Sequence, residues 1–191
     1  MTHPQDVDWS KLPVPEDDGA ANHLTGLAVP SVPLSATDGS SVDLAALPGL
    51  TIVYIYPMTA QPGQALPDGW EATPGARGCT GQVCAVRDHA EELHALGVAR
   101  IFGLSTQGID DQREAAQRLN LPFPLLSDRD LRFVQALNLP TMDVDGMIFC
   151  KRLTLAIHDG VIVQTFYPVF PPDEAPYQVR SWLTLQGPFG Q

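Results

Sequence analysis

The hydrophobic pattern switches repeatedly between strand-like and helix-like spacing. Residues 50–56 form an unbroken run of β-branched and aromatic side chains bounded by Pro48-Gly49 and Pro57, which predicts a central strand covered on both faces. Apolar residues then recur every three or four positions over residues 79–96, and Gly97 follows as a stop signal. The pattern therefore predicts a buried strand, a connection and an amphipathic helix.

The same alternation continues downstream. We expect strands at 98–106 and 122–128 and helices at 110–120 and 130–138. Strands that alternate with helices usually pair in parallel, so the predicted fold class is α/β with a mixed central sheet. A last helix at about 173–185 would cover this sheet.

Two hairpins are predicted from dipeptides that favour tight turns. Residues 29–44 alternate apolar and polar positions around Asp38-Gly39, which indicates an N-terminal β-hairpin. Near the other end, the runs 147–157 and 161–170 flank Asp159-Gly160 and predict antiparallel strands.

The chain is expected to form one domain with an arm. Residues 1–28 contain several prolines and an acidic run without sustained periodicity, which predicts an N-terminal arm, and residues 29–187 form the predicted domain. Within it, residues 57–78 are rich in proline and glycine and form a loop longer than the about 12 to 15 residues that are common. Loops of this length are usually functional or disordered.

Composition excludes several classes of partner. The 22 acidic and 11 basic residues give a formal charge of -11, which repels nucleic acid and anionic membranes. No apolar run is long enough for a membrane span and no secretory signal is recognisable, so we expect a cytoplasmic protein. Three cysteines are too few for a disulfide scaffold, and two of them lie five positions apart, which suggests redox or metal chemistry.

The pair Cys79 and Cys84 is the strongest chemical signal. Cys79 falls at the start of a predicted helix, where free backbone N–H groups favour a thiolate. On an intact helix, positions five apart have Cα atoms about 8 to 9 Å apart, beyond the roughly 7 Å limit for a disulfide, so bridging would require the first turn to unwind. Ordinary buried thiols are the alternative reading. A zinc site with His89 and His94 is disfavoured, because the four side chains point around the helix axis.

The residues around this pair resemble a known family. The segment PGARGCTGQVCAVRD after the strand-Tyr-Pro of IVYIYP, together with KRLTLAIHDGVIV, is similar to the peroxiredoxins, particularly the bacterioferritin comigratory protein or PrxQ branch, over roughly residues 28–185. The resemblance implies a thioredoxin-like fold. It also implies that Cys79 is the peroxidatic cysteine, Cys84 the resolving cysteine of an intramolecular disulfide, and Arg152 the residue that stabilises the thiolate and polarises the peroxide.

The chain also departs from the family pattern. Ala76 stands where the usual P-x-x-x-T-x-x-C loop has threonine, so either Thr73 with Pro74 or Thr80 is expected to supply the hydroxyl. Gln82 stands where the branch often has glutamate.

Two further side chains are open to interpretation. Trp70, within the 57–78 insertion, either belongs to a lid or merely anchors the loop. Cys150 is expected to be a buried core thiol on the same strand face as Arg152, because it lies two residues before it.

The resemblance predicts a peroxidase that reduces hydrogen peroxide or an organic hydroperoxide and is recycled by thioredoxin or a similar dithiol protein. No metal, haem or flavin is implied, and the protein is expected to be a monomer or a homodimer. A thiol–disulfide oxidoreductase is disfavoured, because such enzymes typically carry C-x-x-C. A redox-sensing interaction protein, in which the disulfide alters a surface at the long loop, is the alternative from another class.

Overall fold

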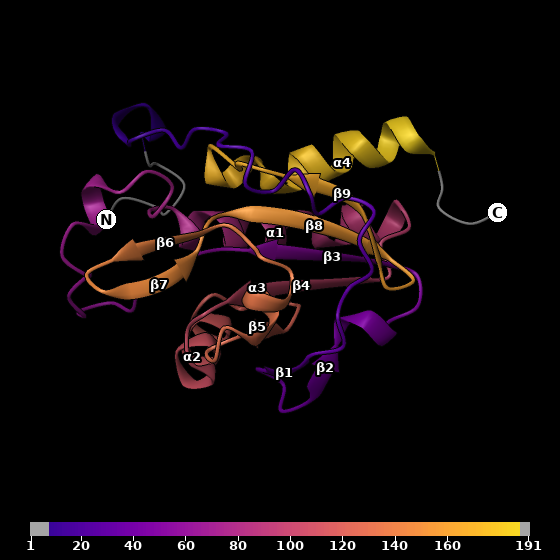
Figure 1. The fold of residues 1–191 in the computed structure, drawn as a ribbon, viewed down its shortest axis with the longest axis horizontal. Helices are drawn as coiled ribbons and strands as arrows, with labels where there is room; N and C mark the ends of the chain where they lie inside the picture. The colour runs from indigo at the N-terminus through magenta and orange to yellow at the C-terminus, as the bar shows by residue number, and fades with distance from the viewer. Residues whose placement is uncertain (1–7, 188–191) are drawn as a thin grey trace.

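The computed structural model describes residues 8–187 and contains a seven-stranded mixed sheet. The sheet lies at the centre of the molecule (Figure 1). The strand order is β2-β1-β5-β4-β3-β8-β9. The strands are β1 (Pro33–Ala36), β2 (Ser41–Asp43), β3 (Leu50–Ile55), β4 (Arg100–Ser105), β5 (Leu125–Ser127), β8 (Leu153–His158) and β9 (Val161–Phe166). Because β3, β4 and β5 pair in parallel while the outer strands pair antiparallel, the predicted α/β class with a mixed sheet is confirmed.

Helices and the chain before β1 cover the two faces of this sheet. The helices are α1 (Cys79–Ala95), α2 (Ile109–Arg118), α3 (Arg132–Ala136) and α4 (Ala175–Gln186). On β3, Ile52 and Tyr54 join a buried cluster with α1 and α4, whereas Val53 and Ile55 join a cluster with α3 and Leu24. Both faces of β3 are therefore buried, as its unbroken apolar run predicts.

Both predicted hairpins are present. β1 and β2 pair antiparallel around Asp38-Gly39, and β8 and β9 pair antiparallel around Asp159-Gly160. Glycine is needed at position 160, where φ is 76° and a Cβ atom would lie 2.6 Å from the Ala45 carbonyl oxygen.

The prediction of one strand over residues 147–157 is wrong. This stretch divides into β7 (Met147–Cys150) and β8, and β7 pairs with β6 (Thr141–Val144) in a separate two-stranded sheet. Lys151 and Arg152 lie between the two strands, and the Lys151 N–H donates to the Pro140 carbonyl at 2.8 Å. Cys150 and Arg152 therefore do not share a strand face, because Cys150 ends β7 and Arg152 lies in the connection to β8.

The first described residues of the arm and the long loop lie at the same end of the molecule, near the β6–β7 sheet (Figure 1). The loop includes the 3-10 helix η3 (Trp70–Ala72), and the described part of the arm includes the 3-10 helix η1 (Trp9–Lys11). Residues 1–7 of the predicted arm lie outside the described residues, and the division at residue 28 stays a prediction. Between residues 8 and 187, no helix has the length and apolar character needed to cross a membrane.

Candidate active site

Cys79 is the first residue of α1 and lies beside the carboxyl end of β3. Gly78 caps the helix with a φ of 97°, and the Gln82 N–H donates to the Gly78 carbonyl at 2.9 Å in the first helical turn. The Met58 N–H, just beyond β3, donates to Cys79 Sγ at 3.4 Å. The side chain of Cys79 is almost fully buried, with 3% of its surface exposed. A sulfur at a helix N-terminus with a backbone donor favours negative charge.

Arg152 brings a permanent positive charge to this sulfur. Its Nη2 atom lies 3.3 Å from Cys79 Sγ, and Arg152 is itself 3% exposed. The same nitrogen donates to the carbonyl oxygens of Arg77 at 2.8 Å and Gly75 at 3.2 Å, so the loop before α1 holds the guanidinium in place. The structure thus brings Cys79 and Arg152 together from positions 73 residues apart.

Gln82 completes the contacts of the guanidinium. It lies on α1 one turn after Cys79, it is fully buried, and its Oε1 accepts a hydrogen bond from Arg152 Nη1. Because only the amide oxygen can accept, this contact fixes the orientation of the Gln82 side chain. Within residues 8–187, Gln82 Nε2 and Arg152 Nε have no hydrogen-bond partner.

Cys84 lies on the same helix but borders a different cavity. Both cysteines are free thiols, and α1 is helical from Cys79 through Ala95. Helical geometry therefore keeps their Cα atoms about 8 to 9 Å apart, too far for a disulfide without unwinding. Burial raises the pKa of the Cys84 thiol, an effect that the nearby Arg87 guanidinium partly opposes.

A cavity of about 210 Å³ opens at Cys79. Its lining is mostly apolar and includes Met58, Leu66, Trp70 and Ala76. Trp70 is buried against Phe149 of β7, with ring centroids 5.0 Å apart in an edge-to-face arrangement. Trp70 therefore anchors the insertion and also forms part of the wall beside the sulfur.

Thr73 and Pro74 are not among the residues that line the cavity at Cys79. The Thr73 hydroxyl donates to the Gly69 carbonyl at 2.9 Å. Both residues line a separate cavity of about 410 Å³ beside Arg152, whereas Thr80 lines the cavity at Cys79. Of the two candidate threonines, Thr80 shares a cavity with Cys79 and Thr73 does not, and the assignment of Thr73 and Pro74 to catalysis stays a prediction.

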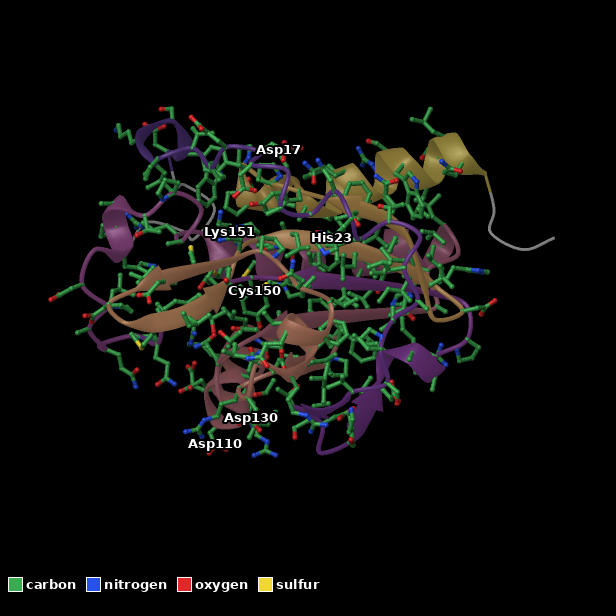
Figure 2. All side chains as sticks on the ribbon, viewed as in Figure 1. Asp17, His23, Asp110, Asp130, Cys150 and Lys151 are labelled. Carbon is green, nitrogen blue, oxygen red and sulfur yellow. The ribbon has the colours of Figure 1, made fainter. Side chains whose placement is uncertain are left out.

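Cys150 is a core thiol, as expected. It is fully buried, and its Sγ lies 3.4 Å from the Pro140 carbonyl oxygen. Burial raises the pKa of this thiol far above its ordinary value. Next to it, Lys151 faces the arm above the sheet (Figure 2), where its Nζ lies 2.7 Å from Asp18 Oδ2.

Sequence reasoning missed Met58 and Leu66 beside the sulfur, and it missed Trp9. Trp9, from the arm, lines the cavity at Cys79 and also the cavity at Cys84. The available signal was a single large aromatic side chain within a polar segment, which often marks a docking point because such a ring gains much from burial.

The family model described as Redoxin matches residues 24–179. The chain belongs to the redoxin family. This redoxin is 28% identical over 150 residues to peroxiredoxin Q of Oryza sativa subsp. japonica, which covers 78% of this chain and 61% of the rice protein. It is 26% identical over 171 residues to peroxiredoxin Q of Populus jackii, covering 86% and 72% of the two chains. The chain thus spans less than two thirds of the length of the rice relative. The family match and these relatives confirm the predicted resemblance to the PrxQ branch of the peroxiredoxins.

Solved structures support the thioredoxin-like fold. Peroxidoxin BcpB of Mycobacterium tuberculosis aligns with a TM-score of 0.68 at 22% identity, covering 85% of this redoxin and 98% of that chain. A bacterioferritin comigratory protein of Xanthomonas campestris, described for its alkyl peroxide reduction activity, aligns with a TM-score of 0.67 at 20% identity, covering 86% and 98%. At these identities the likeness shows the fold alone, and the predicted thioredoxin-like class is confirmed.

Proposed function

We propose that this redoxin is a thiol peroxidase in which Cys79 attacks a hydroperoxide. The observation that carries the proposal is the placement of Cys79 Sγ at a helix start, 3.3 Å from Arg152 Nη2 and 3.4 Å from the Met58 N–H. Both donors stabilise a thiolate before the reaction. The Met58 N–H and the positive charge of the guanidinium also stabilise the oxygen on which charge develops as the peroxide bond breaks.

The first step oxidises the sulfur. The Cys79 thiolate attacks one oxygen of the hydroperoxide, so an S–O bond forms and the O–O bond breaks. The second oxygen leaves with the electron pair of that bond and takes a proton, which yields water or an alcohol and a Cys79 sulfenic acid. Arg152 holds its charge at all accessible pH values, so it stabilises the leaving oxygen without itself transferring a proton.

The second step forms the disulfide of an atypical two-cysteine peroxidase. After the start of α1 unwinds, the Cys84 thiolate attacks the sulfenic sulfur, the S–O bond breaks, and hydroxide leaves as water on protonation. A dithiol protein such as thioredoxin then reduces the Cys79–Cys84 disulfide by two thiol–disulfide exchanges. The position of both cysteines on one helix supports a bond within one chain.

The substrate is hydrogen peroxide or an organic hydroperoxide. The apolar side chains of Met58, Leu66 and Trp70 around the cavity support the organic alternative, because an alkyl group there is removed from water. The activity named for the Xanthomonas campestris protein agrees with this alternative.

Rapid mixing of the reduced protein with hydrogen peroxide and with cumene hydroperoxide, followed by mass spectrometry, tests the proposal. Cys79→Ser should abolish turnover, and Cys84→Ser should oxidise once and accumulate the sulfenic acid. Cys150→Ser is the matched control, because Cys150 is a thiol of the same protein buried outside the site, and it should leave the first oxidation unchanged. A wild type that reacts no faster than free cysteine would overturn the proposal and favour the redox-sensing alternative.

A further inference from the structure

The indole of Trp9 lies against the first turn of α1. A Cβ atom placed on Gly81 would lie 3.2 Å from Trp9 Cη2, and one on Gly78 would lie 3.0 Å from Trp9 Cζ3. These two glycines enclose Cys79 in the sequence, so the ring covers the same turn that carries the reactive sulfur. The absence of side chains at both positions allows this close approach.

A second segment of the chain holds Trp9 in this position. Trp9 Nε1 donates to Asp173 Oδ2 at 3.0 Å, across 164 residues of sequence. Asp173 belongs to the 3-10 helix η4 (Pro172–Glu174), and Pro172 Cγ would lie 2.5 Å from a Cβ on Gly78. The arm and η4 therefore meet on one turn of α1, and we call Trp9, Pro172 and Asp173 the latch.

The latch contributes residues to the cavities at both cysteines. Trp9 and Gly81 line the cavity of about 210 Å³ at Cys79 and also the cavity of about 240 Å³ at Cys84. Asp173 lines the second of these cavities. A path that brings the two sulfurs together must therefore displace the indole or the turn beneath it.

The turn under the latch is intrinsically weak. Glycine is a poor helix former because it loses more backbone freedom than other residues, and Gly81 lies within the second half of this turn. The first turn of any helix also lacks intrahelical acceptors for its N–H groups. Packing from outside the helix consequently contributes much of what keeps residues 79–82 helical.

We propose that Trp9 is a positioning residue that keeps the first turn of α1 folded, and that it must leave Gly78 and Gly81 before Cys84 reaches the Cys79 sulfenic acid. This inference rests on the proposed two-cysteine function. The latch slows disulfide formation and so prolongs the sulfenic acid. During that time a second hydroperoxide can transfer an oxygen to the sulfur, leaving as water or alcohol and producing the sulfinic acid.

Removal of the ring separates the two steps of the reaction. Quenched-flow mass spectrometry should show disulfide formation about tenfold faster in Trp9→Ala than in the wild type, the usual effect of losing one well-packed aromatic contact. The sulfinic acid fraction at a given peroxide concentration should fall by a similar factor. A general loss of structure would be recognised by a slower first oxidation, because it would separate Arg152 from Cys79.

Three companion variants define what part of the latch matters. Asp173→Ala removes the acceptor of the Trp9 hydrogen bond and leaves the ring. It should therefore accelerate disulfide formation and lower the sulfinic acid fraction, each by a smaller factor than Trp9→Ala. Trp9→Phe keeps an aromatic ring on the glycines and should remain within about threefold of the wild type. Lys11→Ala, an exposed change in the same arm, is the matched control and should have no effect.

Hydrogen exchange tests the latch without any turnover. In the reduced protein, the amides of residues 82–84, the first in α1 with intrahelical acceptors, should exchange about tenfold faster in Trp9→Ala than in Lys11→Ala. Equal exchange together with equal disulfide rates in these two variants would overturn the latch and leave the peroxidase intact. Absence of any disulfide in the wild type would instead overturn the two-cysteine function, and the exchange result would then decide about the latch alone.

Discussion

Gln82 accepts a hydrogen bond from Arg152, and both side chains are buried beside Cys79. The amide is neutral, so the charge of the guanidinium is not cancelled by its partner. Gln82 thus orients Arg152 while leaving its positive charge to act on the sulfur. This arrangement explains how a chain without the glutamate often found in the branch retains a site suited to a thiolate.

Gln82→Met tests this relationship. Methionine has a similar length but cannot accept the Arg152 hydrogen bond, and an unpaired buried donor of a charged group costs about 1 to 3 kcal/mol. We expect the rate of Cys79 oxidation to fall about tenfold. The free energy of unfolding should decrease by about 1 to 3 kcal/mol, the cost of the unpaired donor. Stopped-flow kinetics and urea denaturation measure the two effects.

Gln82→Glu is the complementary change. It retains an acceptor, so Arg152 keeps its position, but it adds a negative charge one helical turn from the sulfur. Like charges disfavour each other's ionised form, so the pH of half-maximal peroxide reactivity should rise by about one unit. An unchanged pH profile would mean that charge at this position does not reach Cys79.

Arg152→Lys removes the planar fork that contacts Gln82, two backbone carbonyls and Cys79. An ammonium group cannot satisfy these directions simultaneously, and loss of one oriented donor to a developing oxyanion costs about 10² to 10³ in rate. We expect peroxide oxidation of Cys79 to slow by at least 10², measured by competition with a reference peroxidase. A loss below tenfold would show that the guanidinium is not required.

Cys84 should react slowly with alkylating agents while α1 is folded. Burial raises its pKa, so a smaller fraction is thiolate than in a free thiol. In a Cys79→Ser, Cys150→Ser background, iodoacetamide at pH 8 should modify Cys84 at least tenfold more slowly in buffer than in 6 M urea. Peptide mass spectrometry gives the rates.

The raised pKa of Cys84 also affects stability. The Cys84 thiol stabilises the folded protein below its unfolded pKa of about 8.5, and this stabilisation is lost at higher pH.

The arm should loosen in acid because of Asp18. Its hydrogen bonds from Lys151, Tyr167 and the Ala20 N–H, in that order, hold the pKa of Asp18 far below its usual range. A lowered pKa stabilises the fold above the unfolded value of about 3.9, and this stabilisation is lost as pH falls further. Asp18→Asn should therefore lower the free energy of unfolding by more at pH 7 than at pH 2. Urea titrations at the two pH values measure it, with Asp17→Asn as the neighbouring control.

Sequence patterns predicted the elements whose own spacing of apolar residues shows which side is buried. The apolar run of β3 and the spacing in α1 each indicate which side is buried, and Asp38-Gly39 fixes its own turn. The division of residues 147–157 into β7 and β8 was missed. A strand-like alternation of side chains does not reveal whether all the residues of a run belong to the same sheet. The consequence is functional, since Arg152 turns toward Cys79 at the point where the chain changes sheets.

The sequence predicted those residues of the candidate site whose side-chain chemistry alone indicates a role. Cys79, Cys84 and Arg152 follow from spacing and resemblance, but the position of the Thr73 hydroxyl depends on how the insertion folds over Trp70. The contact of Trp9 with Asp173 is more remote still, because nothing near residue 9 indicates what lies 164 residues away. Such contacts depend on the whole fold.

The separation between Trp9 and Asp173 also has a consequence for the newly made protein. Translation at about 5 to 20 residues per second puts roughly 10 to 30 s between the synthesis of these two residues. Cys79 is made 94 residues before Asp173, so for roughly 5 to 20 s of that interval the chain contains Cys79 while the acceptor for the indole does not yet exist. The nascent chain therefore carries its reactive thiol on an uncovered helix start, and the finished site is assembled only when synthesis has passed residue 173.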